Sequence, residues 1–412
     1  MLKRILIVNP TSSVEYLARS FKSRDFKVYA IFNHDLLANN LPHYDEFMHK
    51  INSTFDTIFD EIFTFATTNI ALIVSQLEKL KLDYILNGSE YSTSLSDQLG
   101  YILTPNFANN PKTSKFRQNK FLTIEQAKNL SSILTPAQKL VNRKELTDHN
   151  YLKSCVANFK WPIFCKPDDG RGSIGVFKAE SFDQLINQLQ QRKIMNDYIF
   201  QEFIDGVEYF VDVVSIQGQH IVAAVGKYTK QYMNDTPVYR SSELVNDKKI
   251  VLKIELAVNE LLNAIDCKNG FNHIEIIITQ DIKIYLVEVN NRISGGNGSN
   301  CFMENHVGLK SQDVILAEYL HNTNQMLYQP PWQFKGTVCA VDLYKFNPGY
   351  LENIEEILAA HKLKTMVKYF EGLVSGSYIQ KLNFISILDS IGCVILFDLD
   401  RNNVLHDIKT IQ

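Results

Sequence analysis

The apolar positions of the first hundred residues alternate between two patterns. Short, nearly continuous apolar runs at Arg4–Val8, Lys27–Phe32 and Tyr84–Leu86 predict buried strands. Between them, Ser13–Ser23 and Asn69–Lys79 have the pattern of helices. Strands that alternate with helices form parallel βαβ units, whose ligand-facing loops follow the carboxyl ends of the strands. We therefore expect a Rossmann-like α/β domain at the start of the chain.

The middle of the chain has a different pattern. From about Pro136 the sequence predicts short strands and hairpins, interrupted by an amphipathic helix near Phe182–Gln191. Further helices are predicted over Val251–Leu262 and after Ser311. Residues 234–247 are polar and lack a period, so we expect a loop there.

Local start and stop signals divide the chain further. Asn110-Pro111 places a capping side chain before a proline, which predicts the start of a helix that carries Lys120. Gln329-Pro330-Pro331 predicts a linker. The remainder, Gly336–Gln412, mixes strands with a helix and is expected to end in the apolar strand Cys393–Phe397.

Composition narrows the class of protein. The 412 residues are 45% hydrophobic and 21% charged, which is typical of a soluble globular protein of about three domains. The net charge of −3 gives no reason to expect a nucleic-acid or membrane partner. Six scattered cysteines contain no CxxC pair, and no apolar stretch approaches the ~18–20 residues of a membrane helix. We expect reduced thiols and a cytoplasmic location.

The first candidate site is the glycine-rich segment KPDDGRGSIGV, residues 166–176. Its glycines are flanked by strand-like residues on both sides, whereas a dinucleotide-binding loop requires a strand followed by a helix. A glycine loop between two strands predicts a flap that can lay backbone N–H groups over phosphates, although a plain hairpin has the same pattern. Lys166, just before the loop, can place its ammonium group against a phosphate oxygen. The other protein-kinase signatures are missing.

The segment QEFIDGVEYFVDVV, residues 201–214, predicts a strand, a turn and a second strand. The backbone of Gln201–Ile204 could read the edge of an adenine ring, and Glu208 could accept hydrogen bonds from ribose hydroxyls. Taken alone, Glu208 is more typical of an exposed acidic turn.

The most specific pattern is FNHIEIIITQDIKIYLVEVNNRISGG, residues 271–296. If Gln280-Asp281 is a two-residue hairpin loop, Glu275, Glu288 and Asn290 share one face, with the glutamates as diagonal neighbours. A three-residue loop would break this parity. Carboxylate and amide oxygens are the hard ligands that Mg²⁺ takes together with phosphates. The alternative, a surface face of the hairpin, fits poorly with the surrounding isoleucines and valines.

Three further features adjoin this hairpin. Arg292 can make a bidentate contact to phosphate or carboxylate. Gly295 and Gly296 would let backbone amides approach an acyl oxyanion. His273 faces a carboxylate and is more typical of a structural partner than of a catalytic group.

In this order, the motifs resemble the ATP-grasp superfamily of carboxylate–amine (or thiol) ligases, over about residues 105–320. The resemblance implies α/β and α+β architecture with the ATP-grasp fold. It implies a Rossmann-like pre-ATP-grasp domain at residues 1–108, a two-lobed ATP-grasp domain at 109–325 and a small α+β domain at 326–412. The nucleotide would lie between the two lobes.

The resemblance also implies roles for individual residues. Lys120 and Lys166 would bind phosphates under the 170–175 loop, with Lys227 as a further phosphate lysine. Arg292 would stabilise an acyl phosphate. The expected catalytic residues are Arg292 and Lys166. The remaining assignments are Gly172, Ser173 and Gly175 over the phosphates, Gln201, Glu202, Phe203 and Ile204 at adenine, Glu208 at ribose, and Glu275, Glu288 and Asn290 at Mg²⁺, with Mn²⁺ as an alternative.

Two features are similar to the bacterial L-amino acid ligases within this superfamily. NGSEYSTSLSDQLG, residues 87–100, carries Glu90, which could meet a substrate amino group. The segment GLVSGSYIQKLNFISILDSIGCVI is similar, more loosely, to the last domain of that group. With Arg292, Gly295 and Gly296, Glu90 completes the expected substrate site. Asn291 departs from the pattern, because many relatives have proline or alanine there.

The sequence therefore favours ATP-dependent activation of a carboxylate, expected to be that of an amino acid, as an acyl phosphate. Attack by an amine would give an amide or dipeptide, with ADP and phosphate. Two alternatives stay open: a bicarbonate-activating carboxylase of the same superfamily, and a non-catalytic ATP-binding regulatory protein. Small-molecule carboxylates and amines are the expected partners, without nucleic acid or membrane, and a homodimer is compatible with the sequence.

Overall fold

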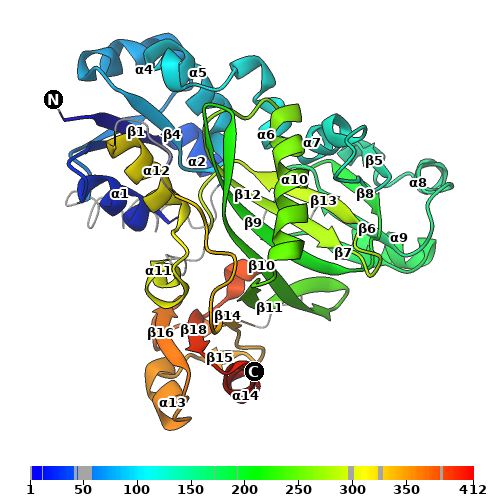
Figure 1. Ribbon diagram of the computed structural model, residues 1–412. Coiled ribbons are helices and arrows are strands. Elements are labelled where there is room, and N and C mark those ends of the chain that lie inside the picture. Colours follow the sequence, from blue (N-terminus) through cyan, green and yellow to red (C-terminus); the bar gives the residue numbers. More distant parts are fainter. Residues whose placement is uncertain are drawn as a thin grey trace.

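The computed structural model describes the chain except for residues 1, 12, 41–43, 45–57, 171, 193, 296–300, 323–327 and 381–383. Its strands form a parallel sheet of four strands, an antiparallel sheet of four, a sheet of eight and a pair (Figure 1). Within the described part of the chain, no helix has both the length and the apolar character needed to cross a membrane.

The predicted N-terminal α/β domain is a parallel sheet in the order β3-β2-β1-β4. Ile5–Val8 are fully buried, which explains their continuous apolar run, because a parallel sheet is covered on both faces. The sequence prediction missed the third strand. The elements are β1 (Arg4–Val8), α1 (Val14–Lys22), β2 (Lys27–Asn33), α2 (His34–Asn40), β3 (Glu61–Phe65), α4 (Ile70–Leu77), η2 (Glu78–Leu80), β4 (Tyr84–Asn87), η3 (Glu90–Ser92), α5 (Thr93–Leu103) and η4 (Pro105–Phe107).

The helix predicted from Asn110-Pro111 is broken into η5 (Pro111–Thr113), α6 (Lys115–Gln118) and α7 (Lys120–Ala127). The break is at Asn119, which is extended and whose side chain accepts a hydrogen bond from Leu122 N. Asn119 is therefore the N-cap of α7 and fixes Lys120 at its first position. The buried Arg117 anchors this region to α5 through a 2.7 Å ion pair with Asp97.

The second sheet is antiparallel, with the order β5-β8-β6-β7, and packs against two helices. The glycine-rich loop connects β6 to β7, so it lies between two paired strands, as expected. The helix predicted near Phe182–Gln191 is confirmed. The elements are β5 (Gln138–Val141), η6 (Arg143–Glu145), α8 (His149–Cys155), β6 (Ile163–Pro167), β7 (Phe177–Ala179), α9 (Phe182–Gln190) and β8 (Tyr198–Glu202).

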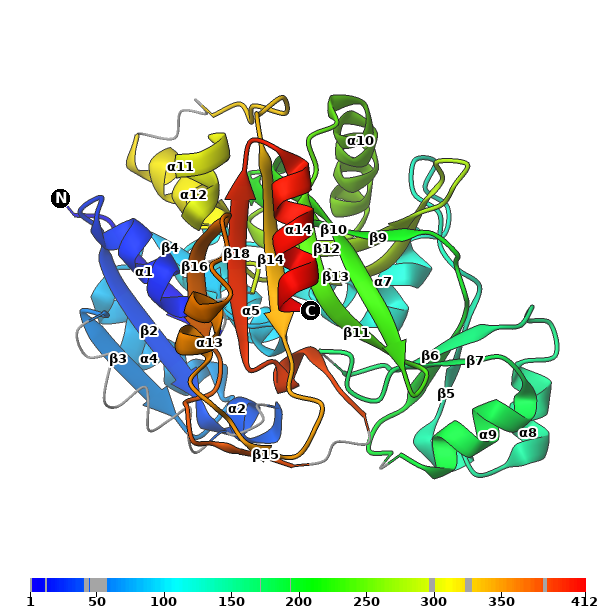
Figure 2. The ribbon, with the colours of Figure 1, turned by 90° about the horizontal axis from the view of Figure 1, so that it is seen from below.

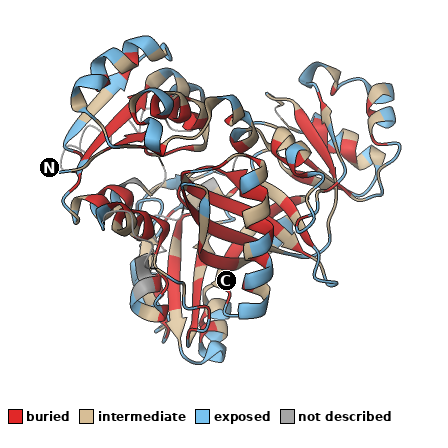
Figure 3. Cartoon of the chain, turned by 45° about the horizontal axis from the view of Figure 1, so that its top comes forward, coloured by how far each residue is buried: buried red, intermediate tan, exposed pale blue. Residues whose placement is uncertain are grey.

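The eight-stranded sheet has the order β13-β12-β9-β10-β11-β14-β18-β16. Helix α10 packs on the β9–β12 part, and α14 covers β14 and β18, as Figure 2 shows. The burial map in Figure 3 shows buried residues along most of these strands. The elements up to the linker are β9 (Val207–Ile216), β10 (Gln219–Met233), β11 (Thr236–Leu244), α10 (Lys248–Ala264), β12 (Gly270–Ile278), β13 (Ile284–Asn290), α11 (Cys301–Val307) and α12 (Gln312–His321).

The prediction of a loop at residues 234–247 is wrong, because strand β11 occupies most of the segment. Its backbone pairs with β10 on one side and with β14 on the other, so the strand needs no apolar period of its own. One of its polar side chains also forms ion pairs. Glu243 binds Lys227 and Arg401.

The C-terminal strands extend the same sheet. The prediction that the chain ends in an apolar strand is wrong. Helix α14 follows β18, and the side chain of Asp400 caps its first turn. The division into three domains stays a prediction, and the eight-stranded sheet continues across its boundary at residue 325. The elements are β14 (Thr337–Leu343), β15 (Gly349–Tyr350), α13 (Ile354–Ala360), β16 (Met366–Glu371), β17 (Tyr378–Ile379), η7 (Ile387–Asp389), β18 (Gly392–Asp398) and α14 (Arg401–Ile411).

Candidate active site

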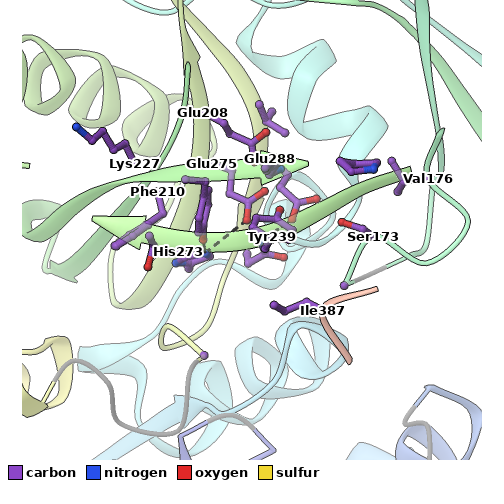
Figure 4. Close-up of a pocket in the computed structure, with 18 of the residues that line it drawn as sticks. Ser173, Val176, Glu208, Phe210, Lys227, Tyr239, His273, Glu275, Glu288 and Ile387 are labelled. Atoms are coloured by element: carbon purple, nitrogen blue, oxygen red, sulfur yellow. Dashed lines mark hydrogen bonds and ion pairs between the residues drawn. The ribbon is translucent and has the colours of Figure 1, made fainter. Parts of the chain in front are cut away.

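A cavity of about 1220 Å³ brings most of the predicted site residues together (Figure 4). Its lining comes from the small antiparallel sheet, the eight-stranded sheet, the segment after β4 and the C-terminal strands. Gly175 is not among the lining residues, and Gly296 lies outside the described part of the chain. The predicted residues that line the cavity are Glu90, Lys120, Lys166, Gly172, Ser173, Gln201, Glu202, Phe203, Ile204, Glu208, Lys227, Glu275, Glu288, Asn290, Arg292 and Gly295.

The hairpin of β12 and β13 carries the two glutamates on the cavity face, but not by the predicted register. The turn has three residues between Thr279 and Lys283, rather than the two expected, and Ile282 has a φ of 60°. A register shift then follows, so that Ile276 opposes Leu286 while Glu275 directly opposes Glu288. The shift is a β-bulge whose extra residue restores the parity that the longer turn removes.

That extra residue is Val287, which has no partner in the ladder with β12. Its carbonyl oxygen accepts a hydrogen bond of 3.0 Å from Lys166 Nζ. Lys166 is 4% exposed, and burial lowers the pKa of its ammonium group to about 8, although Glu288 raises it. The bulge therefore positions a buried lysine beside the glutamate pair.

Lys120 and Glu288 form the second charged contact, with Nζ 3.2 Å from Oε2. Lys120 Nζ also donates to the carbonyl oxygen of Gly170 in the glycine loop. Burial alone would raise the pKa of Glu288, but Lys120, Lys166 and a 2.8 Å hydrogen bond from Asn290 hold it at about 2. Glu288 is therefore ionised at neutral pH between two ammonium groups.

Each ring nitrogen of His273 contacts a carboxylate. Its Nδ1 lies 2.7 Å from a carboxylate oxygen of Asp212, and its Nε2 lies 3.6 Å from Glu275. Burial lowers the pKa of His273, but these two carboxylates outweigh it and raise the value to about 9. The sequence prediction missed Asp212, and a usable signal was present, because it is a lone carboxylate in the apolar run FVDVV.

Glu208 lies on the same face and pairs with a lysine that the sequence prediction did not identify. Lys230 Nζ is 2.5 Å from Glu208 Oε1 and 4.0 Å from the ring centroid of Tyr239. Burial raises the pKa of Glu208, and Lys230 opposes this shift. The ammonium group of Lys227 instead lies 3.3 Å from Glu243, away from the glutamate pair in Figure 4. Alternation along β10 explains the difference, because positions 227 and 230 face opposite sides.

The glycine loop is shaped by positive φ angles at Gly172, Ser173 and Gly175. A Cβ at position 175 would lie 2.8 Å from the hydroxyl oxygen of Tyr198, so this residue must be glycine for close packing. The carbonyl oxygen of Gly172 accepts a hydrogen bond of 3.3 Å from Ile387 N, which ties the loop to the C-terminal part of the chain.

The predicted adenine segment follows the end of β8. Gln201 and Glu202 pair with the neighbouring strand β6, whereas no strand pairing is recorded for Phe203 or Ile204 within the described residues. Both residues line the cavity, where backbone groups outside the strand pairing could form hydrogen bonds to a flat ring.

The predicted substrate residues meet where the N-terminal domain touches the end of β13. Arg292 Nε lies 2.8 Å from Glu90 Oε2, which joins residues two hundred positions apart. Nearby, Asn87 donates to the carbonyl oxygen of Asn291 at 2.6 Å. The Asn291 side chain is buried and donates to Phe271 O and to Asn272. Asn291 therefore fixes the backbone between Asn290 and Arg292, both of which line the cavity.

The donor set fits a divalent cation together with phosphates. Glu275 and Glu288 are opposed carboxylates on one face, with the Asn290 amide beside them. In the part of the chain that the structure describes, no three His, Cys, Asp or Glu side chains are arranged as a metal site. Phosphate oxygens would have to complete the coordination, as is usual for Mg²⁺.

Comparison with known proteins supports the resemblance. Residues 117–296 match the family described as ATP-grasp domain. Dapdiamide A synthase from Enterobacter agglomerans is 28% identical over 239 residues, which are 55% of this chain and 54% of that protein. The chain spans about half the length of the curated relatives it matches.

Two solved structures resemble nearly the whole chain. L-amino acid ligase from Bacillus licheniformis has a TM-score of 0.74 and 15% identity, over 99% of this chain and 96% of that one. N5-carboxyaminoimidazole synthase from Aspergillus clavatus, in complex with ADP and a ribonucleotide, has a TM-score of 0.71 and 14% identity, over 100% and 97%. At such identity the likeness shows the fold alone. The predicted fold class is confirmed: residues 117–296 match the ATP-grasp domain, and the fold of these solved structures extends over nearly the whole chain.

Proposed function

We propose that this protein is an ATP-dependent carboxylate–amine ligase that activates the carboxylate of an amino acid. The observation that carries the proposal is the charged cluster at the β12–β13 hairpin. It has a buried ammonium group on Lys166 and a partly buried one on Lys120, an ionised glutamate between them and a second glutamate directly opposite. This cluster shares one cavity with the Glu90–Arg292 pair.

The cluster suits the transfer of a phosphoryl group. Lys120 and Lys166 can bind phosphate oxygens, and the glycine loop over them excludes water and supplies backbone N–H groups. Glu275, Glu288 and Asn290 would hold Mg²⁺, which when bound supplies charge neutralisation on the polyphosphate. Phe203, Ile204 and Glu208 would hold the nucleoside.

The reaction begins when a carboxylate oxygen attacks the γ-phosphorus of ATP and ADP leaves. The resulting acyl phosphate has inorganic phosphate as a leaving group, which a free carboxylate lacks. The amine nitrogen then attacks the acyl carbon, and the products are an amide, phosphate and a proton. Arg292 can hold the acyl phosphate through its guanidinium group, while Glu90 fixes the orientation of that group and can meet an ammonium.

ADP release with a panel of amino acids and amines under Mg²⁺ and ATP tests this proposal. We expect release that depends on both an amino acid and an amine. Lys166→Ala should lower the rate and raise the ATP requirement together. Lys283→Ala is the matched control, because Lys283 is an exposed lysine in the turn of the same hairpin. No amino-acid-dependent release from the folded protein would contradict the proposal.

The same experiment separates two rival functions. The fold is also shared with N5-carboxyaminoimidazole synthase, and release of ADP with bicarbonate alone would favour a bicarbonate-activating carboxylase. Tight ATP binding without release for any substrate would favour a regulatory protein. Mn²⁺ in place of Mg²⁺, a homodimer and a cytoplasmic location stay predictions.

A further inference from the structure

The cavity extends beyond the residues assigned so far. It continues over the strands that the C-terminal segment adds to the eight-stranded sheet. This extension, which we call the C-terminal pocket, is lined by Ser242, Leu244, Val338, Ala340, Asp342, Phe370, Cys393 and Ile395.

The register of the strands places these side chains on the face that carries the candidate active site. Tyr228 of β10 opposes Ser242 of β11, which opposes Ala340 of β14. Ala340 in turn opposes Ile395 of β18. Because directly opposed residues share a face, the C-terminal pocket and the active site form one continuous surface.

Asp342 is the unusual member of this mostly apolar lining. Among the described residues, no hydrogen bond or ion pair to its carboxylate is recorded. The cation that acts on Asp342 is Arg240, whose guanidinium carbon lies over the rings of Tyr344 and Phe346, at 5.9 and 5.3 Å from their centroids. Burial raises the pKa of Asp342 to about 7, although Arg240 lowers it. Asp342 is half-buried and lines the cavity, so its carboxylate can be reached by a ligand that enters the C-terminal pocket.

The lysines and Arg292 that line the cavity have contacts elsewhere in the protein: Lys166 donates to the carbonyl oxygen of Val287, and Lys227 lies against Glu243. Lys120 contacts Glu288, Lys230 contacts Glu208 and Arg292 contacts Glu90. Among the described residues, Arg240 acts on Asp342 without a recorded ion pair, and no lysine ammonium group pairs with it, so the carboxylate is available to a cationic group of a ligand.

We propose that Asp342 recognises a protonated amine at the end of an aliphatic chain of one substrate. The side chains of Ala340, Phe370 and Ile395 would pack against the methylene groups, and Asp342 would accept hydrogen bonds from the terminal ammonium. The specificity is thus for a basic, lysine-like substrate. This inference rests on the proposed function for the reaction that the bound substrate would undergo. The binding of the basic group does not depend on that function.

Calorimetric titration of L-lysine and L-norleucine into the protein tests the inference. Both titrations contain Mg²⁺ and a non-hydrolysable ATP analogue. Norleucine has the same carbon chain but no terminal amine. We expect lysine to bind about tenfold to a hundredfold more tightly than norleucine, which is the typical effect of a charge-assisted hydrogen bond.

Asp342→Asn should remove this preference and leave norleucine binding unchanged. Glu371→Gln is the matched control, because Glu371 is an exposed carboxylate that lines the same cavity. It should keep the lysine preference. Equal binding of the two amino acids by the natural protein, no detectable lysine binding, or equal loss in both variants would each overturn the inference.

The fold of the variants is monitored through their affinity for the ATP analogue, which should not change. The binding measurement requires no turnover. If lysine binds through Asp342 but no amino acid supports ADP release, the proposed ligase activity fails and the recognition of a basic group stands. If ADP is released with other amino acids while lysine gives no preference, the recognition fails and the ligase stands.

Discussion

Lys166 should take up a proton when the nucleotide binds. Its ammonium group is buried, and this desolvation lowers its pKa to about 8 in the ligand-free protein. Because the pKa is lowered, the charge is present below pH 8 and is lost as the pH rises through this value. A polyphosphate beside Lys166 would return the pKa toward its ordinary value near 10.4, because a nearby negative charge favours the protonated form.

The size of the effect follows from these two pKa values. At pH 8.5 roughly three quarters of the ligand-free sites have a neutral Lys166, whereas at pH 7 only about a tenth do. Binding at pH 8.5 should therefore take up roughly 0.7 of a proton at this residue, compared with about 0.1 at pH 7. The affinity should fall roughly fourfold between the two conditions.

Titration of the ATP analogue by calorimetry, in buffers of different ionisation enthalpy, measures this proton uptake directly. The difference between the natural protein and Lys166→Arg isolates the contribution of Lys166, since arginine keeps its charge over the whole range. If both proteins take up the same number of protons at pH 8.5, the lysine is not the titrating group. The contact between the 166 side chain and the phosphates would then have to be abandoned.

Three further substitutions test separate parts of the site. Glu288→Gln should leave the fold intact and lower ADP release by about 10²–10³ at saturating Mg²⁺, because it removes a preorganised charge; unchanged activity would refute the metal assignment. Asn291→Ala should destabilise the protein by about 1–3 kcal/mol in urea unfolding, because it leaves the buried oxygen of Phe271 without its donor; an unchanged midpoint would contradict this role. Gly175→Ala should strain the glycine loop against Tyr198, and we expect weaker nucleotide binding by titration; natural affinity would show that the loop can adapt.

The charged cluster was predictable because its signal is local. Carboxylates among branched apolar residues are uncommon unless something compensates them, and this rule identified Glu275 and Glu288. The same rule applies to Asp212, whose partner, His273, lies on another strand. Lys227 and Lys230 could not be separated by motif alone, since the choice depends on which face of β10 meets the cavity.

The non-local parts of the fold were harder to predict. Strand β11 pairs with β14, about a hundred residues further along the chain, so neither sequence window contains the reason for the pairing. The two-residue turn at Gln280-Asp281 was the simplest hairpin, and only the observed register reveals the third turn residue and the bulge. The sequence thus predicted that the two glutamates share a face, but it did not predict the three-residue turn and the bulge that place them there.

That construction limits how the hairpin can change length. One extra residue in the turn and one extra residue at Val287 cancel, so losing either alone would turn one of the two acidic side chains to the far side of the sheet. Losing both together would keep them on one face, as diagonal rather than directly opposed neighbours, but would remove the carbonyl that receives Lys166. Insertions and deletions in this segment should therefore be tolerated only in compensating pairs. Even a paired loss would leave the lysine without its anchor.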